Sequence, residues 1–385
     1  MPKQEPDGVR VACIAASRIP SRTANSIRVM KVCQSLADIG HDVHLWVPRA
    51  REAFDWAQAR ANYGLRREFP ISFVKGWSVL RRWDFSLRSA SAGMRWGADL
   101  FYVWPYQAAA MLSVLGRPTV LEVHDRPAGF AGPMLFRWIL RGRGLRRLLP
   151  ITESLRATLE RDYGPALRPP RTVVLPSGVD VEAYEDLPGP RQARHRLGLP
   201  QAFTAVYTGH LYPGRGVELL AELARRNPAI SFVWAGGEPR DVEAWAARTR
   251  AQGLVNVHVL GFVAQARLPL VHAAADVLLM PYARKITVSS GGDTSAFASP
   301  LKAFEYMAAG RAILASDLPV LHEVLHAKNA VLVPPEDVDV WNAALRSIRR
   351  DAKRRASLAG RARREAARFS WIARTRRALE GLDIA

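Results

Sequence analysis

Short apolar runs alternate with amphipathic segments along almost the whole chain. In the first half, residues 25–39 repeat Ile27, Met30 and Ala37 at helical spacing, and Gly40 supplies a stop signal. The apolar runs around this helix are short and bounded by polar or turn residues, which is typical of buried strands. The strands predicted in this half are residues 11–16, 42–47, 71–75, 99–103, 119–123, 148–151 and 172–175.

The second half repeats the alternation. Its predicted strands are residues 204–208, 231–235, 255–260, 276–280, 312–315 and 330–333, and its predicted helices are residues 216–226, 239–252, 300–309 and 338–349. Such alternation indicates an α/β protein with two Rossmann-like, doubly wound parallel sheets. Two such domains are expected to hold a ligand at the carboxyl ends of their strands.

A polar, proline-bearing segment at residues 186–197 follows the turn at residues 176–178 and indicates the domain junction. We therefore expect an N-terminal domain at residues 1–187 and a C-terminal domain at residues 188–367. The final helix, at about residues 368–385, is expected to pack back on the first domain.

Composition narrows the class of protein. The chain has 385 residues, 49% of them hydrophobic, which excludes collagen-like and extended disordered chains. Its net charge of +20 favours anionic partners such as nucleotide phosphates or an acidic membrane. No zinc spacing or aromatic RNA-binding signature supports a nucleic-acid partner. Two isolated cysteines, a polar N-terminus and the lack of a long apolar stretch favour a cytoplasmic protein.

A basic, aromatic-containing stretch occupies residues 130–149, which read FAGPMLFRWILRGRGLRRLL. One interpretation is peripheral docking on the anionic inner face of the cytoplasmic membrane. The other is a core-facing helix whose solvent side is rich in arginine. The sequence leaves both interpretations open.

Two segments of the second half carry candidate ligand-binding chemistry. In the first segment, Ser299 suits the N-cap of a helix, Pro300 suits its first position, and Gly310 suits its end. The start of this helix would offer free N–H groups to a phosphate. Glu305, inside that helix, is placed to accept hydrogen bonds from a ribose. In the second, residues 207–220 form a strand, a glycine loop bearing Arg215, and a helix. A lone arginine on such a loop is suited to a diphosphate.

These residues resemble the glycosyltransferase family 4 group, which comprises retaining, nucleotide-sugar-dependent enzymes with the GT-B fold. The resemblance is strongest over residues 207–324. Residues 299–319 look like the nucleotide-sugar signature, residues 174–180 like the interdomain segment, and residues 122–125 like the segment of the first-domain histidine. The resemblance implies that His124, Asp125 and Arg215 are the catalytic residues. The implied donor-binding set is Gly209, His210, Asp293, Ser299, Pro300, Leu301, Lys302 and Glu305.

Two positions depart from the family pattern. Phe297 stands where the first glutamate of a Glu-x7-Glu pair would be, and His210 stands where an arginine is usual. Asp293, in the adjoining loop, is a candidate replacement carboxylate or a simple loop cap.

The resemblance implies transfer of a sugar from a nucleotide-sugar donor to a glycan or lipid-linked acceptor, in cell-envelope polysaccharide or glycoconjugate synthesis. Arg215, Lys302 and the helix start supply positive charge for the departing diphosphate, so we expect no cofactor and no obligatory metal. The Asp337-Val338-Asp339 motif is interpreted as a helix cap. A nucleotide-sugar epimerase and a catalytically silent nucleotide-binding partner protein are the alternatives.

Overall fold

The computed structural model describes residues 8–49, 53–76, 82–167, 169–285 and 295–383. It divides into two compact units, residues 1–177 with 371–385, and residues 178–370. Residues 178–187, expected in the first domain, lie in the second unit. The reason is local, because the Val179 N–H donates to the Phe369 carbonyl (2.9 Å) and Tyr184 is buried in the second unit's core.

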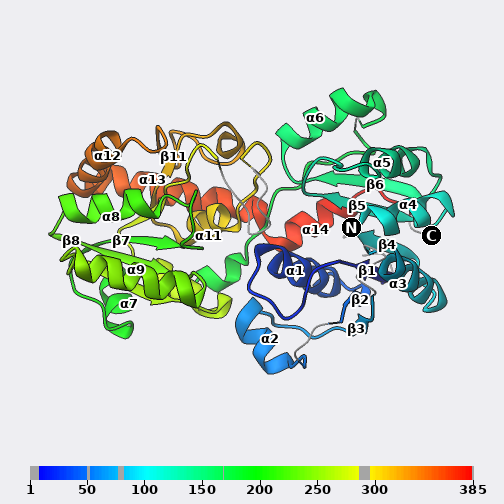
Figure 1. Cartoon of the computed structure of the whole chain (residues 1–385), viewed down its shortest axis with the longest axis horizontal. Helices are drawn as coiled ribbons and strands as arrows, with labels where there is room; N and C mark the ends of the chain where they lie inside the picture. The colour runs from blue at the N-terminus through cyan, green and yellow to red at the C-terminus, as the bar shows by residue number, and fades with distance from the viewer. Residues whose placement is uncertain (1–7, 50–52, 77–81, 168, 286–294, 384–385) are drawn as a thin grey trace, which may run out of the picture. The chain divides into compact units, whose positions relative to one another are not determined.

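The first unit is built on a six-stranded parallel sheet of order β3-β2-β1-β4-β5-β6. Its strands are β1 (Arg10–Ile14), β2 (Asp42–Pro48), β3 (Ile71–Val74), β4 (Leu100–Val103), β5 (Thr119–Val123) and β6 (Leu145–Pro150). Its helices are α1 (Ala24–Asp38), α2 (Trp56–Tyr63), α3 (Trp83–Arg95), α4 (Tyr106–Val114), α5 (Gly132–Arg141), α6 (Glu153–Tyr163) and α14 (Trp371–Leu379) (Figure 1).

The second unit repeats this plan with the strand order β12-β11-β10-β7-β8-β9. Its strands are β7 (Phe203–Thr208), β8 (Ile230–Ala235), β9 (Val257–Gly261), β10 (Val277–Met280), β11 (Ala312–Ser316) and β12 (Val331–Val333). Its helices are α7 (Pro190–Arg196), α8 (Val217–Arg226), α9 (Pro239–Ala251), α10 (Leu268–Ala273), α11 (Leu301–Ala309), α12 (Val338–Arg350) and α13 (Ala352–Ala366).

Both sheets confirm the expected doubly wound α/β class. The direction of winding reverses between β1 and β4 in one sheet and between β7 and β10 in the other. Ligands of such sheets bind where the winding reverses, at the carboxyl ends of the strands. The predicted strand at residues 172–175 was wrong. That segment runs beside β6, where Val173 and Leu175 donate their N–H groups to the carbonyls of Leu148 and Pro150 (3.0 and 2.9 Å), but it forms only one isolated bridge, Leu148 to Thr172, and no strand.

The end of the chain is shared between the units. Helix α14 packs against α1, where the hydroxyls of Ser35 and Thr375 are hydrogen-bonded. Phe369, just before α14, instead packs against Phe304 of α11, with ring centroids 5.0 Å apart. Helix α13 lies against α11 and β11 of the second unit.

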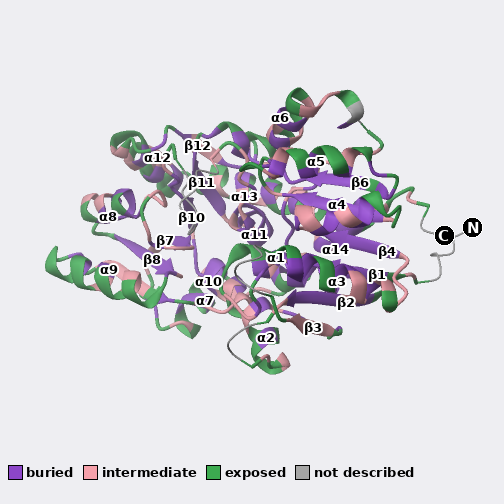
Figure 2. Ribbon diagram, turned by 45° about the vertical axis from the view of Figure 1, so that its right-hand side comes forward, coloured by how far each residue is buried: buried purple, intermediate pink, exposed green. Residues whose placement is uncertain are grey.

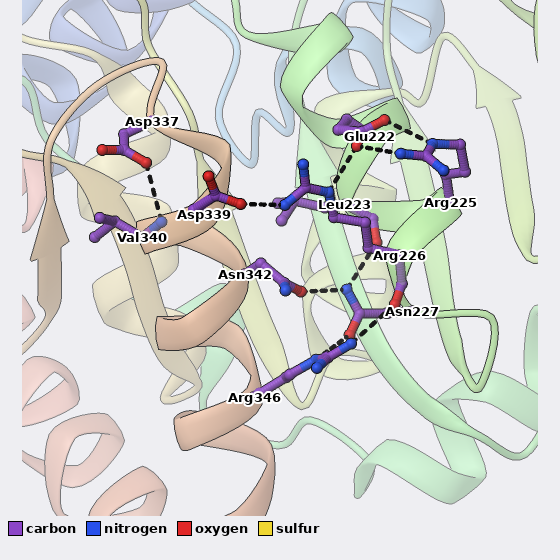
Figure 3. A network of polar contacts seen from close by, with 10 residues as sticks. All are labelled: Glu222, Leu223, Arg225, Arg226, Asn227, Asp337, Asp339, Val340, Asn342 and Arg346. Atoms are coloured by element: carbon purple, nitrogen blue, oxygen red, sulfur yellow. Dashed lines mark hydrogen bonds and ion pairs between the residues drawn. The ribbon is translucent and has the colours of Figure 1, made fainter.

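A polar network joins α8 to α12 in the second unit (Figure 3). Arg226 pairs with both Glu222 and Asp339, and the Asp337 carboxylate accepts the Val340 N–H (3.1 Å). The interpretation of the Asp-x-Asp motif as a helix cap is confirmed, since Asp337 caps α12. None of the helices described is long and apolar enough to cross a membrane.

Candidate active site

The loop after β7 lies at the point where winding reverses in the second sheet. Gly216, directly before α8, has φ +73°, and a Cβ there would lie 1.7 Å from the Pro281 carbonyl oxygen. Only glycine therefore allows this loop to pack against the segment that follows β10. That packing brings Arg215 close to Tyr282.

Arg215 and Lys302 each contact two tyrosines and share one of them, Tyr282. The Arg215 guanidinium carbon lies 5.0 Å from the Tyr212 ring centroid and 5.3 Å from that of Tyr282. The Lys302 ammonium nitrogen lies 4.3 Å from the Tyr207 centroid and 5.0 Å from the Tyr282 centroid. Aromatic faces attract cations. The predicted pair of cations is therefore brought together on Tyr282.

Burial and like charge act together on Lys302. Burial lowers its pKa well below the usual range, Arg215 lowers it further, and Glu305 opposes both effects. Two cations in one partly desolvated site create a demand for negative charge. A diphosphate bound there would meet that demand.

Buried polar groups fix the end of β7 behind these cations. The Thr208 N–H donates to the Tyr306 hydroxyl (2.9 Å), and the Thr208 hydroxyl lies 3.2 Å from His272 Nε2. Burial lowers the pKa of His272 to about 3, so this ring stays neutral near pH 7. His272 is thus a buried packing residue that holds the end of β7.

Helix α11 begins one residue later than expected. Pro300, with φ −72° and ψ 128°, occupies the N-cap position, and Leu301 is the first helical residue. Ser299 is therefore not the N-cap, because the extended backbone of Pro300 delays the first turn. Leu301 and Lys302 still lie in that turn, as a phosphate contact would require.

The remaining donor-side candidates have defined surroundings. Glu305 is buried in α11 and accepts a hydrogen bond from the Gln265 amide, a partner that nothing in the sequence indicated. His210 stacks on Tyr212, with centroids 5.0 Å apart, and its carbonyl accepts the Tyr207 hydroxyl (2.6 Å). The peptide of Gly209 lies near Lys302. Asp293 lies outside the described residues.

In the first unit, His124 directly follows β5. Its Nε2 lies 2.7 Å from a Glu122 carboxylate oxygen, and Arg28 Nη1 lies 3.2 Å from Nδ1. The same Arg28 nitrogen lies 3.3 Å from Nε2. Because a carboxylate only accepts, the short contact with Glu122 favours a ring with its proton on Nε2, which leaves Nδ1 as the acceptor for Arg28. Burial lowers the pKa of His124 and Arg28 lowers it further, against the effect of Glu122.

Glu122 is the centre of this first-unit cluster. Its buried carboxylate lies 2.8 Å from Arg374 Nη2 and accepts the Tyr102 hydroxyl. Burial raises the pKa of Glu122, but Arg374, His124 and Arg28 outweigh burial and hold that pKa well below the usual range. Arg28 also donates to the Ser177 hydroxyl (2.5 Å).

Asp125 is placed differently from His124. It is exposed, and its carboxylate accepts the N–H of Arg126 (2.7 Å). The described contacts thus join His124 to Glu122 and Arg28 but leave the Asp125 side chain at the surface. Within the described ranges, no group of three or more His, Cys, Asp or Glu residues is clustered as metal ligands are.

Comparison with known proteins identifies the class. Residues 26–183 match the model of Glycosyltransferase Family 4, and residues 202–351 match the model of Glycosyl transferases group 1. The chain belongs to the family 4 glycosyltransferases and has their GT-B fold.

Individual relatives agree with this assignment. A D-inositol 3-phosphate glycosyltransferase of Kineococcus radiotolerans is 29% identical, over 97% of this chain and 80% of its own. A GDP-mannose-dependent alpha-(1-6)-phosphatidylinositol monomannoside mannosyltransferase of Mycobacterium tuberculosis is 28% identical, over 86% of each chain. The crystal structure of HepE from Anabaena in complex with UDP is similar in fold, with a TM-score of 0.73, 18% identity, and coverage of 96% of this chain and 98% of that one.

Proposed function

We propose that this glycosyltransferase moves a sugar, with retention of anomeric configuration, from a nucleotide sugar to a glycan or lipid-linked acceptor of the cell envelope. The observation that carries the proposal is the placement of Arg215 and Lys302 on Tyr282, at the reversal point of the second sheet. Two cations there suit a diphosphate and stabilise it as a leaving group.

The names of the relatives support the donor and acceptor classes. The mycobacterial relative is GDP-mannose-dependent and acts on a phosphatidylinositol mannoside, the Kineococcus relative acts on inositol 3-phosphate, and HepE holds UDP. A phosphorylated polyol or its lipid conjugate is accordingly the first acceptor to test with this chain.

The proposed transfer is a substitution on one face of the sugar. The bond from the anomeric carbon to the diphosphate oxygen breaks, and a bond to the acceptor hydroxyl oxygen forms on the same side. The acceptor proton passes to the departing phosphate oxygen, so the protein need not supply a base. In this scheme Arg215, Lys302 and the first turn of α11 hold the diphosphate, Glu305 holds the ribose, and His124 borders the sugar.

Calorimetry with UDP, GDP, dTDP and ADP, each with and without magnesium, tests the donor site. We expect one nucleotide to bind preferentially, and Arg215→Ala to weaken binding while Arg240→Ala, an exposed change on α9, leaves binding unaltered. Transfer is then assayed with that nucleotide's sugars and inositol phosphate or lipid extracts.

The outcomes separate the three candidate functions. Formation of a glycosylated acceptor with an unchanged anomeric configuration supports the proposal, and inversion would contradict its stereochemistry. Conversion of the donor without an acceptor would indicate an epimerase. Nucleotide binding with no transfer to any acceptor would indicate a silent partner protein, and no nucleotide binding would overturn the donor site.

A further inference from the structure

Helix α5 has an unusual outer face. Leu135, Phe136 and Ile139 are buried toward the core, so the opposite side faces solvent. That side carries Met134 and Trp138, which are 41% and 45% exposed. Figure 2 shows buried and exposed residues on different sides of this helix. The loop before the helix adds Phe130, which is fully exposed.

Phe130, Met134 and Trp138, here called the α5 stripe, are spaced by four residues, so they follow one side of the helix and its entry. Isolated exposed apolar residues are ordinary, whereas a line of three is not. Helix α4 packs against both α3 and α5. Among the described residues of the first unit, the large exposed apolar side chains all belong to these helices or adjoining residues: Trp83, Leu87, Val114, Leu115, Phe130, Met134 and Trp138.

The charged side chains within the segment that carries the stripe have one sign. Residues 126–147 contain no Asp or Glu, and exposed arginines at 137, 141, 143 and 146 stand beside or beyond the stripe. In the part of the chain that the structure describes, none of these four makes a salt bridge. Arg137 lies instead over the Tyr163 ring, 5.6 Å from its centroid.

We propose that the α5 stripe and its arginines dock this protein on an anionic lipid membrane. Phe, Met and Trp suit the boundary between headgroups and acyl chains, while arginines attract the negative headgroups. A second copy of this chain would present the same arginines and repel them, so charge favours the membrane over self-association.

The stripe starts in the loop that carries His124, between β5 and α5. Docking there brings a lipid surface to the side of the first unit that holds His124. This consequence rests on the proposed function, because docking would help only a transferase whose acceptor is linked to a lipid. The docking itself does not require sugar transfer.

Sedimentation with vesicles tests the surface without any nucleotide present. We expect the protein to bind vesicles of phosphatidylcholine containing about one third phosphatidylglycerol, and to bind pure phosphatidylcholine weakly. Both F130S/W138S and R137Q/R141Q are expected to lose about tenfold or more in binding to the anionic vesicles. The matched control is R240Q/R250Q, which removes two exposed arginines from α9 in the second unit.

Four results would contradict the proposal. Absence of binding by the natural sequence overturns it, and so does binding that the α5 variants leave unchanged. An equal loss in R240Q/R250Q would assign binding to net charge alone. A dimer that F130S/W138S dissociates, without vesicle binding, would assign the stripe to a second copy. Unchanged circular dichroism and nucleotide affinity show that the variants are folded and that the donor site is separate.

Discussion

Glu122 and Arg374 form a buried ion pair, 2.8 Å between carboxylate and guanidinium, although the two residues lie far apart in the sequence. Glu122 lies on β5 and Arg374 on α14. Arg374 also donates to the Pro176 carbonyl (2.7 Å), beside the residue where the first unit's main segment ends. One guanidinium thus fixes both the orientation of His124, through Glu122, and the turn at residue 176.

Arg374→Met should destabilise the first unit strongly. It leaves the Glu122 carboxylate buried without its main cation, which costs about 3–5 kcal/mol for a pair of this kind. Denaturant unfolding measures the loss. Arg377→Met, an exposed change on the same helix, is the control and should cost little. Equal stability of the two variants would show that the pair is not an important contact.

Arg215→Ala should weaken nucleotide binding by roughly ten- to a hundredfold, since a hydrogen bond to a charged group contributes about 1.5–3 kcal/mol. Arg215→Lys keeps the charge but loses the planar group between Tyr212 and Tyr282, so we expect a partial loss. Calorimetry gives both affinities. Unchanged affinity in Arg215→Ala, with the protein folded, would remove this residue from the donor site.

The strands were predictable because a strand buried on both faces of a parallel sheet is a continuous apolar run. β10, with the sequence VLLM, is buried throughout. The boundary between the two units was not predictable from such local runs. Residues 178–187 look like the end of the first domain until the hydrogen bond between Val179 and Phe369 is known.

The residues of the candidate site likewise fall into those that the sequence could predict and those that it could not. Arg215 and Glu305 stand in local motifs, so short-range patterns reveal them. Gln265, Arg28 and Arg374 occupy segments without a motif, and only the fold brings them to Glu305, His124 and Glu122. The prediction that Ser299 is the N-cap of α11 was wrong. A serine before a proline is typical of an N-cap, but here Pro300 takes that position.

Binding of a nucleotide sugar should take up protons at Lys302. The pKa of this lysine is lowered in the free protein by burial and by Arg215, and a bound diphosphate would raise it. Affinity should therefore fall as pH rises through the pKa of the bound state. Calorimetric enthalpies in buffers with different protonation enthalpies measure the uptake, and Lys302→Met should abolish it. A natural protein whose binding enthalpy is independent of buffer would contradict this assignment.

Gly216→Ala should disturb the donor site more than backbone strain alone explains. Gly216 and Gly253 have similar positive φ values, +73° and +66°, so alanine at either position carries the left-handed penalty of about 1–2 kcal/mol. At Gly253 a Cβ would meet open space, whereas at Gly216 it would meet the Pro281 carbonyl. Gly253→Ala is thus the matched control for unfolding and nucleotide affinity. We expect only Gly216→Ala to lose affinity, because it pushes the Arg215 loop away from Tyr282, and equal behaviour of the two variants would show that this contact does not shape the site.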